Sequence, residues 1–200
     1  DRSVRLTLDL FDLQAGQKLA SMQALNEFLS ALVMIKQIGG LVSESDLLRM
    51  TMCIEATIPF RGYTPEGESH FDVMGKRLHE VGKRYGLDLS HEDIVDTIKT
   101  AVTFANKDIE NFAEADPGRF LDNTWKLLPE TNAALRLPDV YSIATYRQAL
   151  QAMENFFEGL DPNTIFNQYR GTPSDDEFRQ KAQAAHRNIT TAREYLRLKI

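Results

Sequence analysis

Apolar side chains recur three and four positions apart along most of this 200-residue chain. That spacing places them on one face of an α-helix, because one helical turn takes about 3.6 residues. Stripes of this kind cover residues 17–38, 43–58, 69–86, 90–112, 117–128, 143–160 and 174–199, and a shorter helix is expected over 161–169. The chain is therefore predicted to be all-α, with about seven helices.

Glycine and small polar residues mark the ends of these helices. Gly39 and Gly86 suit helix C-termini, and serines such as Ser43 suit N-termini. Residues 4–10 alternate apolar and polar side chains as a strand does, but a single short strand has no evident partner, so this lead-in is either extended or helical. Without repeats or a long linker, residues 1–200 are predicted to form one helical domain.

Charge and composition limit the classes of function that we expect for this chain. The chain has 29 acidic and 23 basic residues and a net charge of −6, so nucleic acid is not the expected partner. Its single cysteine, Cys53, rules out an internal disulfide. No apolar run reaches the roughly 18 residues that a membrane helix needs, and no signal peptide is evident. We expect a cytoplasmic protein without a membrane partner.

The first candidate site lies at the end of the helix over 43–58. Glu55 falls on the flank of the apolar stripe, where a carboxylate is costly unless it is paired. Arg61, just beyond the helix, is expected either to neutralise Glu55 and hold the loop or to bind an anionic ligand with its planar fork. Both residues are predicted to bind a ligand.

The second candidate site lies near residue 108. Asp108 has Phe104 and Phe112 one turn away on either side, so it is expected to be surrounded by buried side chains. An acid in such surroundings serves as a ligand, a base or a structural hydrogen-bond acceptor. Asn106 lies on the opposite flank of the same helix and is predicted to contact a ligand.

Trp125, the only tryptophan, is predicted to line a ligand pocket or to fill the core. The remaining polar clusters have simpler interpretations. The acids of segment 88–93 suit a helix N-terminus, and His70, His79 and His186 are expected to be isolated surface residues.

The order of three short motifs resembles the HD-domain metal-dependent phosphohydrolase superfamily. These motifs are Asn-Glu-x-x-Ser-Ala at 26–31, Ile-Glu-Ala-Thr at 54–57 and Ala-Asn-Lys-Asp-Ile at 105–109. The resemblance covers roughly residues 20 to 112 and implies an HD-like helical bundle. It also implies that Asp108 occupies the position of the distal metal-ligand aspartate.

The histidines that hold the metal in that superfamily have no counterpart here, because the chain contains no His-Asp dipeptide. Two hypotheses follow. The chain is a ligand-binding, partner-binding or regulatory module on an HD-like scaffold, with a small anion or a protein as its partner. Alternatively, it is part of a phosphodiesterase or nucleotidase whose His-Asp ligands lie outside residues 1–200. A divalent metal cofactor is expected only in the second case.

Overall fold

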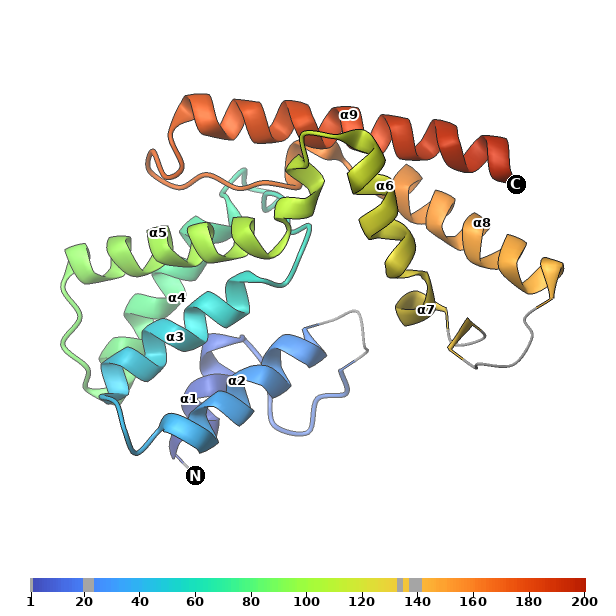
Figure 1. Cartoon of the computed structure of the whole chain (residues 1–200). Coiled ribbons are helices and arrows are strands. Elements are labelled where there is room, and N and C mark those ends of the chain that lie inside the picture. Colours follow the sequence, from blue (N-terminus) through green and yellow to red (C-terminus); the bar gives the residue numbers. More distant parts are fainter. Residues whose placement is uncertain (1, 20–23, 133–134, 137–141) are drawn as a thin grey trace. The chain divides into compact units, whose positions relative to one another are not determined.

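The structure is a computed structural model that describes residues 2–19, 24–132, 135–136 and 142–200 (Figure 1). Within these ranges every regular element is a helix and no strand forms, which confirms the all-α class. Extended pairing is limited there to isolated bridges between Tyr63 and Ser69 and between Tyr169 and Thr172. None of the helices in the same ranges is both long and apolar enough to cross a membrane.

The chain folds into two compact units. Unit 1 comprises residues 1–108 and 167–174, and unit 2 comprises residues 109–166 and 175–200. The expectation that residues 1–200 act as one domain stays a prediction.

Unit 1 is built around α3. Its helices are α1 (Arg2–Leu10), α2 (Leu25–Ile38), α3 (Glu44–Ala56), α4 (His70–Tyr85) and α5 (His91–Asp108). Figure 1 shows α3 beside α2 and α5, and α3 also packs against α1 and α4. The core contains Leu6, Leu10, Leu48, Met52, Phe71, Met74, Leu78, Ile98 and Val102, with Tyr169 at its edge.

Helices α3 and α4 of unit 1 begin after the serines that the sequence predicts. The hydroxyl of Ser43 accepts a hydrogen bond from the Asp46 amide, and Ser69 caps α4 in the same way through Asp72. These bonds satisfy amides that have no partner inside the helix. Gly86 ends α4 with a left-handed φ of 72°, as predicted.

The lead-in over 4–10, for which the sequence allows either an extended or a helical structure, is helical and buries Leu6 and Leu10. Two details differ from the sequence predictions. Residues 17–19, predicted to be helical, are not, and α2 begins at Leu25; residues 20–23 lie outside the described residues. Leu29, Met50 and Ile143 fit the apolar stripes by their spacing but are exposed.

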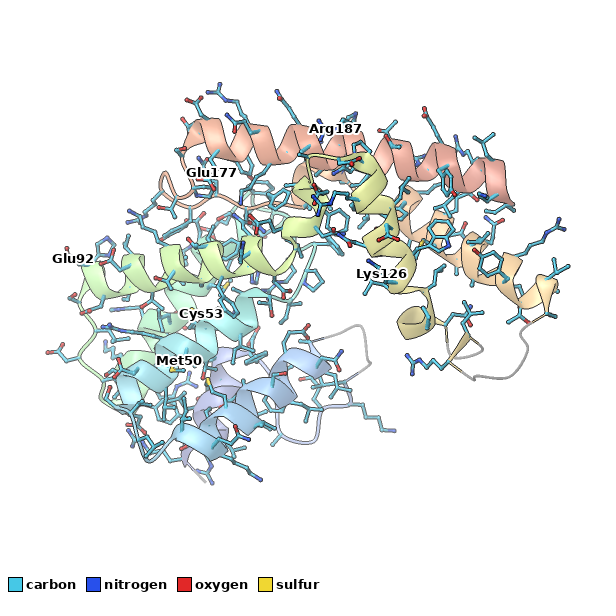
Figure 2. The ribbon with its side chains drawn as sticks, in the orientation of Figure 1. Met50, Cys53, Glu92, Lys126, Glu177 and Arg187 are labelled. Atoms are coloured by element: carbon cyan, nitrogen blue, oxygen red, sulfur yellow. The ribbon has the colours of Figure 1, made fainter. Side chains whose placement is uncertain are left out.

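Unit 2 is built on one long helix. Its elements are η1 (Glu110–Ala113), α6 (Pro117–Lys126), α7 (Leu128–Thr131), α8 (Ile143–Gly159), η3 (Pro162–Thr164) and α9 (Asp175–Lys199). Helix α9 packs against η1, α6, α8 and η3. Arg187 of α9, labelled in Figure 2, donates hydrogen bonds to the carbonyls of Glu114 and Ala115. The predicted short helix over 161–169 is only the 3₁₀ turn η3.

Candidate functional site

Glu55 is the most deeply buried acid for which contacts are described, with 1% of its surface exposed. Arg61 Nη1 lies 2.8 Å from Oε1 of Glu55, and Arg61 Nη2 lies 3.1 Å from Oε2. A second guanidinium, that of Arg77 on α4, lies 2.6 Å from Oε1. His70 Nε2 is 3.7 Å from Oε2, which is beyond hydrogen-bond distance. One carboxylate thus faces two guanidiniums and an imidazole.

The backbone after α3 turns sharply to bring Arg61 back to Glu55. Phe60 adopts a φ of 58°, a left-handed conformation that is rare for a bulky residue. Arg61 then donates hydrogen bonds to the Glu55 carbonyl at the end of α3 and to the Ile58 carbonyl just beyond it. The predicted structural Glu–Arg pair therefore forms, and the same arginine caps the helix.

The charges in this cluster shift the pKa values of two groups. Burial alone raises the pKa of Glu55, but interactions with His70, Arg61 and Arg77 outweigh it and hold that pKa at about 2. Burial lowers the pKa of His70, and the nearby arginines lower it further against the effect of Glu55. Glu55 is therefore ionised near neutral pH. That Glu55 and Arg61 also bind a ligand stays a prediction.

Asp108 does not have the surroundings that the sequence suggested. It is exposed at the end of α5, and Phe104, one turn earlier, has 51% of its surface exposed. The buried stripe of α5 runs through Ile98, Ala101 and Ala105 instead. The expectation that buried side chains surround Asp108 is wrong, because Phe104 is exposed.

Asn106 is buried, and its side-chain amide pairs with the backbone of a distant residue. Its Nδ2 donates to the Asn167 carbonyl at 2.8 Å, and its Oδ1 accepts from the Asn167 amide at 2.9 Å. Asn106 therefore holds the segment 167–174 against α5. This contact gives Asn106 a structural role, whereas the sequence suggested contact with a ligand.

Replacing Asn106 by alanine is expected to destabilise unit 1 by about 1–3 kcal/mol, because both polar groups of the Asn167 backbone lose their partners. Chemical denaturation of the two proteins measures the difference. Asn123→Ala is the matched control, because Asn123 is exposed and its described hydrogen bond is to the Asn111 side chain. An equal effect of the two substitutions would contradict the structural role of Asn106.

Trp125 lies in unit 2 and is half-buried. Its Nε1 donates to the Tyr146 hydroxyl at 3.0 Å, and its ring packs edge-on against Tyr195 with centroids 5.5 Å apart. These contacts agree with the core interpretation of Trp125. The predicted ligand-binding residues are therefore divided between the two units, and only Glu55 and Arg61 are in contact with each other.

A pocket that the sequence did not predict opens beside α4 in unit 1, with a volume of about 400 Å³. We call it the Arg170 pocket, and it is lined by Glu68, Asp72, Gly75, Lys76, His79, His91, Ile94, Val95, Tyr169 and Arg170. Its walls come from α4 and Glu68 just before it, the first turns of α5 and the segment 167–174. Helix α4 thus presents His70 and Arg77 to Glu55 and a separate set of polar residues to this pocket.

Arg170 enters the pocket from a strained turn. Tyr169 and Thr172 exchange two backbone hydrogen bonds of 2.8 and 3.0 Å across Arg170 and Gly171. Both central residues have positive φ, 46° and 75°, as in a type I′ turn. Asparagine is favoured at the first of these positions, and an arginine there costs about 1–2 kcal/mol. Strain of this kind, retained beside a pocket, indicates a functional side chain.

Charges of both signs line the pocket: the acids Glu68 and Asp72 and the bases Lys76 and Arg170. Glu68 is ion-paired with Lys76, and the Asp72 carboxylate accepts a hydrogen bond from Ser69. The Arg170 guanidinium, in contrast, forms no ion pair with any acid in the described part of the chain.

Arg170 instead has two weaker partners. The guanidinium carbon lies 5.4 Å from the centroid of the Tyr169 ring, and Nη1 lies 3.2 Å from Nε2 of His91. Because arginine only donates, His91 accepts here with the Nε2 lone pair. An arginine in this position can release the His91 imidazole and bind a carboxylate or phosphate group instead.

The residues of this pocket gave little signal in the sequence. The sequence indicates an isolated surface position for His79, and His91 lies in a segment that is typical of a helix N-terminus. Arg170 comes from a segment far along the chain, so spacing within one helix could not place it beside them. The one local clue is the Arg-Gly pair after Tyr169, which marks a tight turn.

The divalent metal implied by the HD resemblance does not fit the described residues. Within them, no group of three or more histidine, cysteine or acidic side chains is arranged to hold a metal ion. Asp108, the implied ligand, is exposed on α5. Comparisons with family models, curated proteins and solved structures found no match for this chain.

Proposed function

We propose that this chain is a ligand-binding or regulatory module whose unit 1 binds a small anion in the Arg170 pocket. The observation that carries the proposal is Arg170 itself, an arginine held in a left-handed turn at the pocket wall without an acidic partner among the described residues. The planar guanidinium suits bidentate binding of a carboxylate or phosphate group. A pocket of about 400 Å³ has the size of small-molecule sites.

The neighbouring residues support the same chemistry. Lys76, His79 and His91 line the pocket and can donate to an anion alongside Arg170. Burial raises the pKa of Tyr169, so its hydroxyl keeps its proton and remains a donor. Ile94 and Val95 supply an apolar wall for the carbon part of an organic anion.

The HD-like scaffold and the phosphohydrolase alternative remain proposals that rest on the order of three motifs alone. The enzyme alternative needs metal ligands from outside the described residues, whereas anion binding uses side chains already brought together in unit 1. We therefore favour the binding module.

The test is an NMR titration of the 200-residue protein with inorganic phosphate and, separately, malonate, at ionic strength held constant with sodium chloride. We expect saturable shifts at the backbone signals of Lys76, His79, His91 and Arg170. Arg170→Asn should weaken binding at least ~10-fold, because a charged hydrogen-bond donor is lost. The same substitution should leave the stability within about 1 kcal/mol of the wild type or raise it, since asparagine suits the turn.

Arg84→Asn is the matched control. It makes the same charge change within unit 1, but Arg84 pairs with Asp9 and does not line the pocket. This control should bind both anions as the wild type does. If neither anion gives saturable shifts up to about 50 mM, or if both variants weaken binding equally, the proposed function is wrong.

A further inference from the structure

The Arg170 pocket holds an acid, as well as a base, that has no ion pair in the described part of the chain. Glu68 and Lys76 form an ion pair with each other. Asp72, in the first turn of α4, forms none within the described ranges, and its carboxylate accepts a hydrogen bond from the neutral Ser69 hydroxyl. Arg170 likewise contacts only neutral groups there. The pocket is thus left with one unpaired charge of each sign.

Both unpaired charges lie near Tyr169. The guanidinium carbon of Arg170 is 5.4 Å from the centroid of the Tyr169 ring. The Tyr169 hydroxyl lies 3.6 Å from the position that a side-chain methyl on Gly75 would occupy, and Gly75 follows Asp72 by about one helical turn. Burial raises the pKa of Tyr169, the charge of Arg170 opposes this shift, and the charge of Asp72 adds to it. Asp72 and Arg170 are therefore neighbours of the same buried ring.

The space beside Tyr169 has room for an organic molecule. Gly75 lines it without a side chain, and Cγ2 of Ile94 lies 3.9 Å from the position that a methyl on Gly75 would occupy. Val95 adds a second apolar side chain from α5. A volume of about 400 Å³ is in the range of sites that bind organic ligands, which is more room than a single phosphate group needs.

A simple anion satisfies only one of the two unpaired charges. Bound at Arg170, it would be repelled by the Asp72 carboxylate, because like charges in one pocket raise each other's energy. An ammonium group on the same ligand would replace this repulsion by attraction. Asp72 can accept it, since a carboxylate has about four lone-pair sites and the described bond from Ser69 uses one of them.

We propose that the ligand of the Arg170 pocket is a small zwitterion, such as an amino acid, whose carboxylate binds Arg170 and whose ammonium group binds Asp72. This ligand class rests on the proposed function, because Arg170 must hold the anionic group. The planar guanidinium suits a carboxylate, and an ammonium group offers three N–H donors. Ile94 and Val95 suit the carbon chain between the two charged groups.

Asp72 also helps to cap α4, and the chain offers a control for this structural role. The bond from the Ser69 hydroxyl to Asp72 is repeated at the start of α3, where the Ser43 hydroxyl donates to Asp46. Both acids are exposed, and Asp46 does not line the pocket. Asp46→Asn therefore makes the same change of charge and of helix cap as Asp72→Asn, at a helix start away from the ligand.

The test is an NMR titration of the 200-residue protein with two matched series of compounds, at about pH 7 and constant ionic strength. Acetate, propionate, butyrate and pentanoate are compared with glycine, β-alanine, 4-aminobutyrate and 5-aminopentanoate, which carry an ammonium group at the far end of the same chain. The series varies the distance between the two charges. At the chain length that fits the pocket, the ammonium group should lower the Kd at least ~10-fold, because it gains a charged hydrogen bond to Asp72.

The variants should affect the two series differently. Asp72→Asn should weaken the best zwitterion at least ~10-fold. It should leave the matching carboxylate bound as tightly as before or more tightly, because the repulsion from Asp72 is removed. Arg170→Asn should weaken both compounds, whereas Asp46→Asn should bind every compound as the wild type does. Thermal melting should show a similar Tm for Asp72→Asn and Asp46→Asn.

The outcomes separate the ligand class from the proposed function. A preference for the zwitterion that Asp72→Asn removes and Asp46→Asn retains supports the ligand class. Equal binding of the two series at every length, or a preference that Asp72→Asn retains or Asp46→Asn also removes, overturns the ligand class while the proposed function stands. If phosphate, malonate and all the carboxylates fail to bind up to about 50 mM, the proposed function is wrong. The ligand class is then wrong as well, because it needs Arg170 to hold the carboxylate.

Discussion

Replacing Glu55 by glutamine is expected to lower the free energy of unfolding of unit 1 by about 3–5 kcal/mol. The substitution keeps the shape of the side chain but leaves Arg61 and Arg77 without their shared counter-charge. Removing one partner of a buried ion pair costs this much because the remaining charges stay desolvated. Urea denaturation followed by far-ultraviolet circular dichroism measures the loss.

Two features of the chain allow the effect of Glu55→Gln to be assigned to the buried cluster of unit 1. Trp125 is the only tryptophan and lies in unit 2, so its fluorescence reports the unfolding of unit 2 separately. Glu44→Gln is the matched control, because Glu44 pairs with Arg2 at the surface of the same unit and should contribute no more than about 1 kcal/mol. A loss below about 1 kcal/mol for Glu55→Gln would contradict the role assigned to this cluster.

Acid is expected to destabilise the protein strongly, and Glu55 is expected to account for about 3 kcal/mol of the loss. The pKa of Glu55 is about 2 in the folded protein against an ordinary value of 4.5. A lowered pKa means that the unfolded chain takes up the proton first, so the stabilisation is complete above about pH 5 and is lost as the pH falls from about 4.5 to about 2. Each pH unit in this range corresponds to about 1.4 kcal/mol.

His70 should add an earlier and smaller step. Its lowered pKa means that the unfolded chain binds the proton first as the pH falls through its ordinary value of 6.5. Urea midpoints between about pH 7 and pH 2.5 measure both steps. In Glu55→Gln the lower step should lose the share that belongs to Glu55, and a smaller step should remain from other acids with lowered pKa values, such as Asp93 and Glu158. An unchanged lower step in the variant would refute the assignment.

Much of the fold could be predicted from the sequence because helix ends and stripes are local properties. Ser43, Ser69 and Ser142 each cap the helix that the pattern places after them, and the apolar stripes of α4 and α5 are buried. The apolar pattern fails where side chains from other helices decide whether a position is buried. Ile143 fits its stripe by spacing but begins its helix in an exposed position.

The candidate site was predicted only in part for the same reason. Glu55 and Arg61 lie six residues apart, so their pairing could be inferred from one helix and its loop. Arg77 completes that cluster from another helix, and Arg170 reaches His91 from 79 residues away. Periodicity carries no information about contacts between elements so distant in the chain.

The interleaved path of the chain has a consequence for folding during synthesis. Helices α1–α5 emerge first, but unit 1 is incomplete until residue 174 has been added. At about 5–20 residues per second, the stretch from residue 108 to residue 174 takes the ribosome roughly 3–13 s. During that interval Asn106 has no backbone partner from Asn167, and the cavity beside α4 has no Tyr169 to close it. A nascent chain paused in this window should therefore expose the apolar edge of α4 and α5 to chaperones.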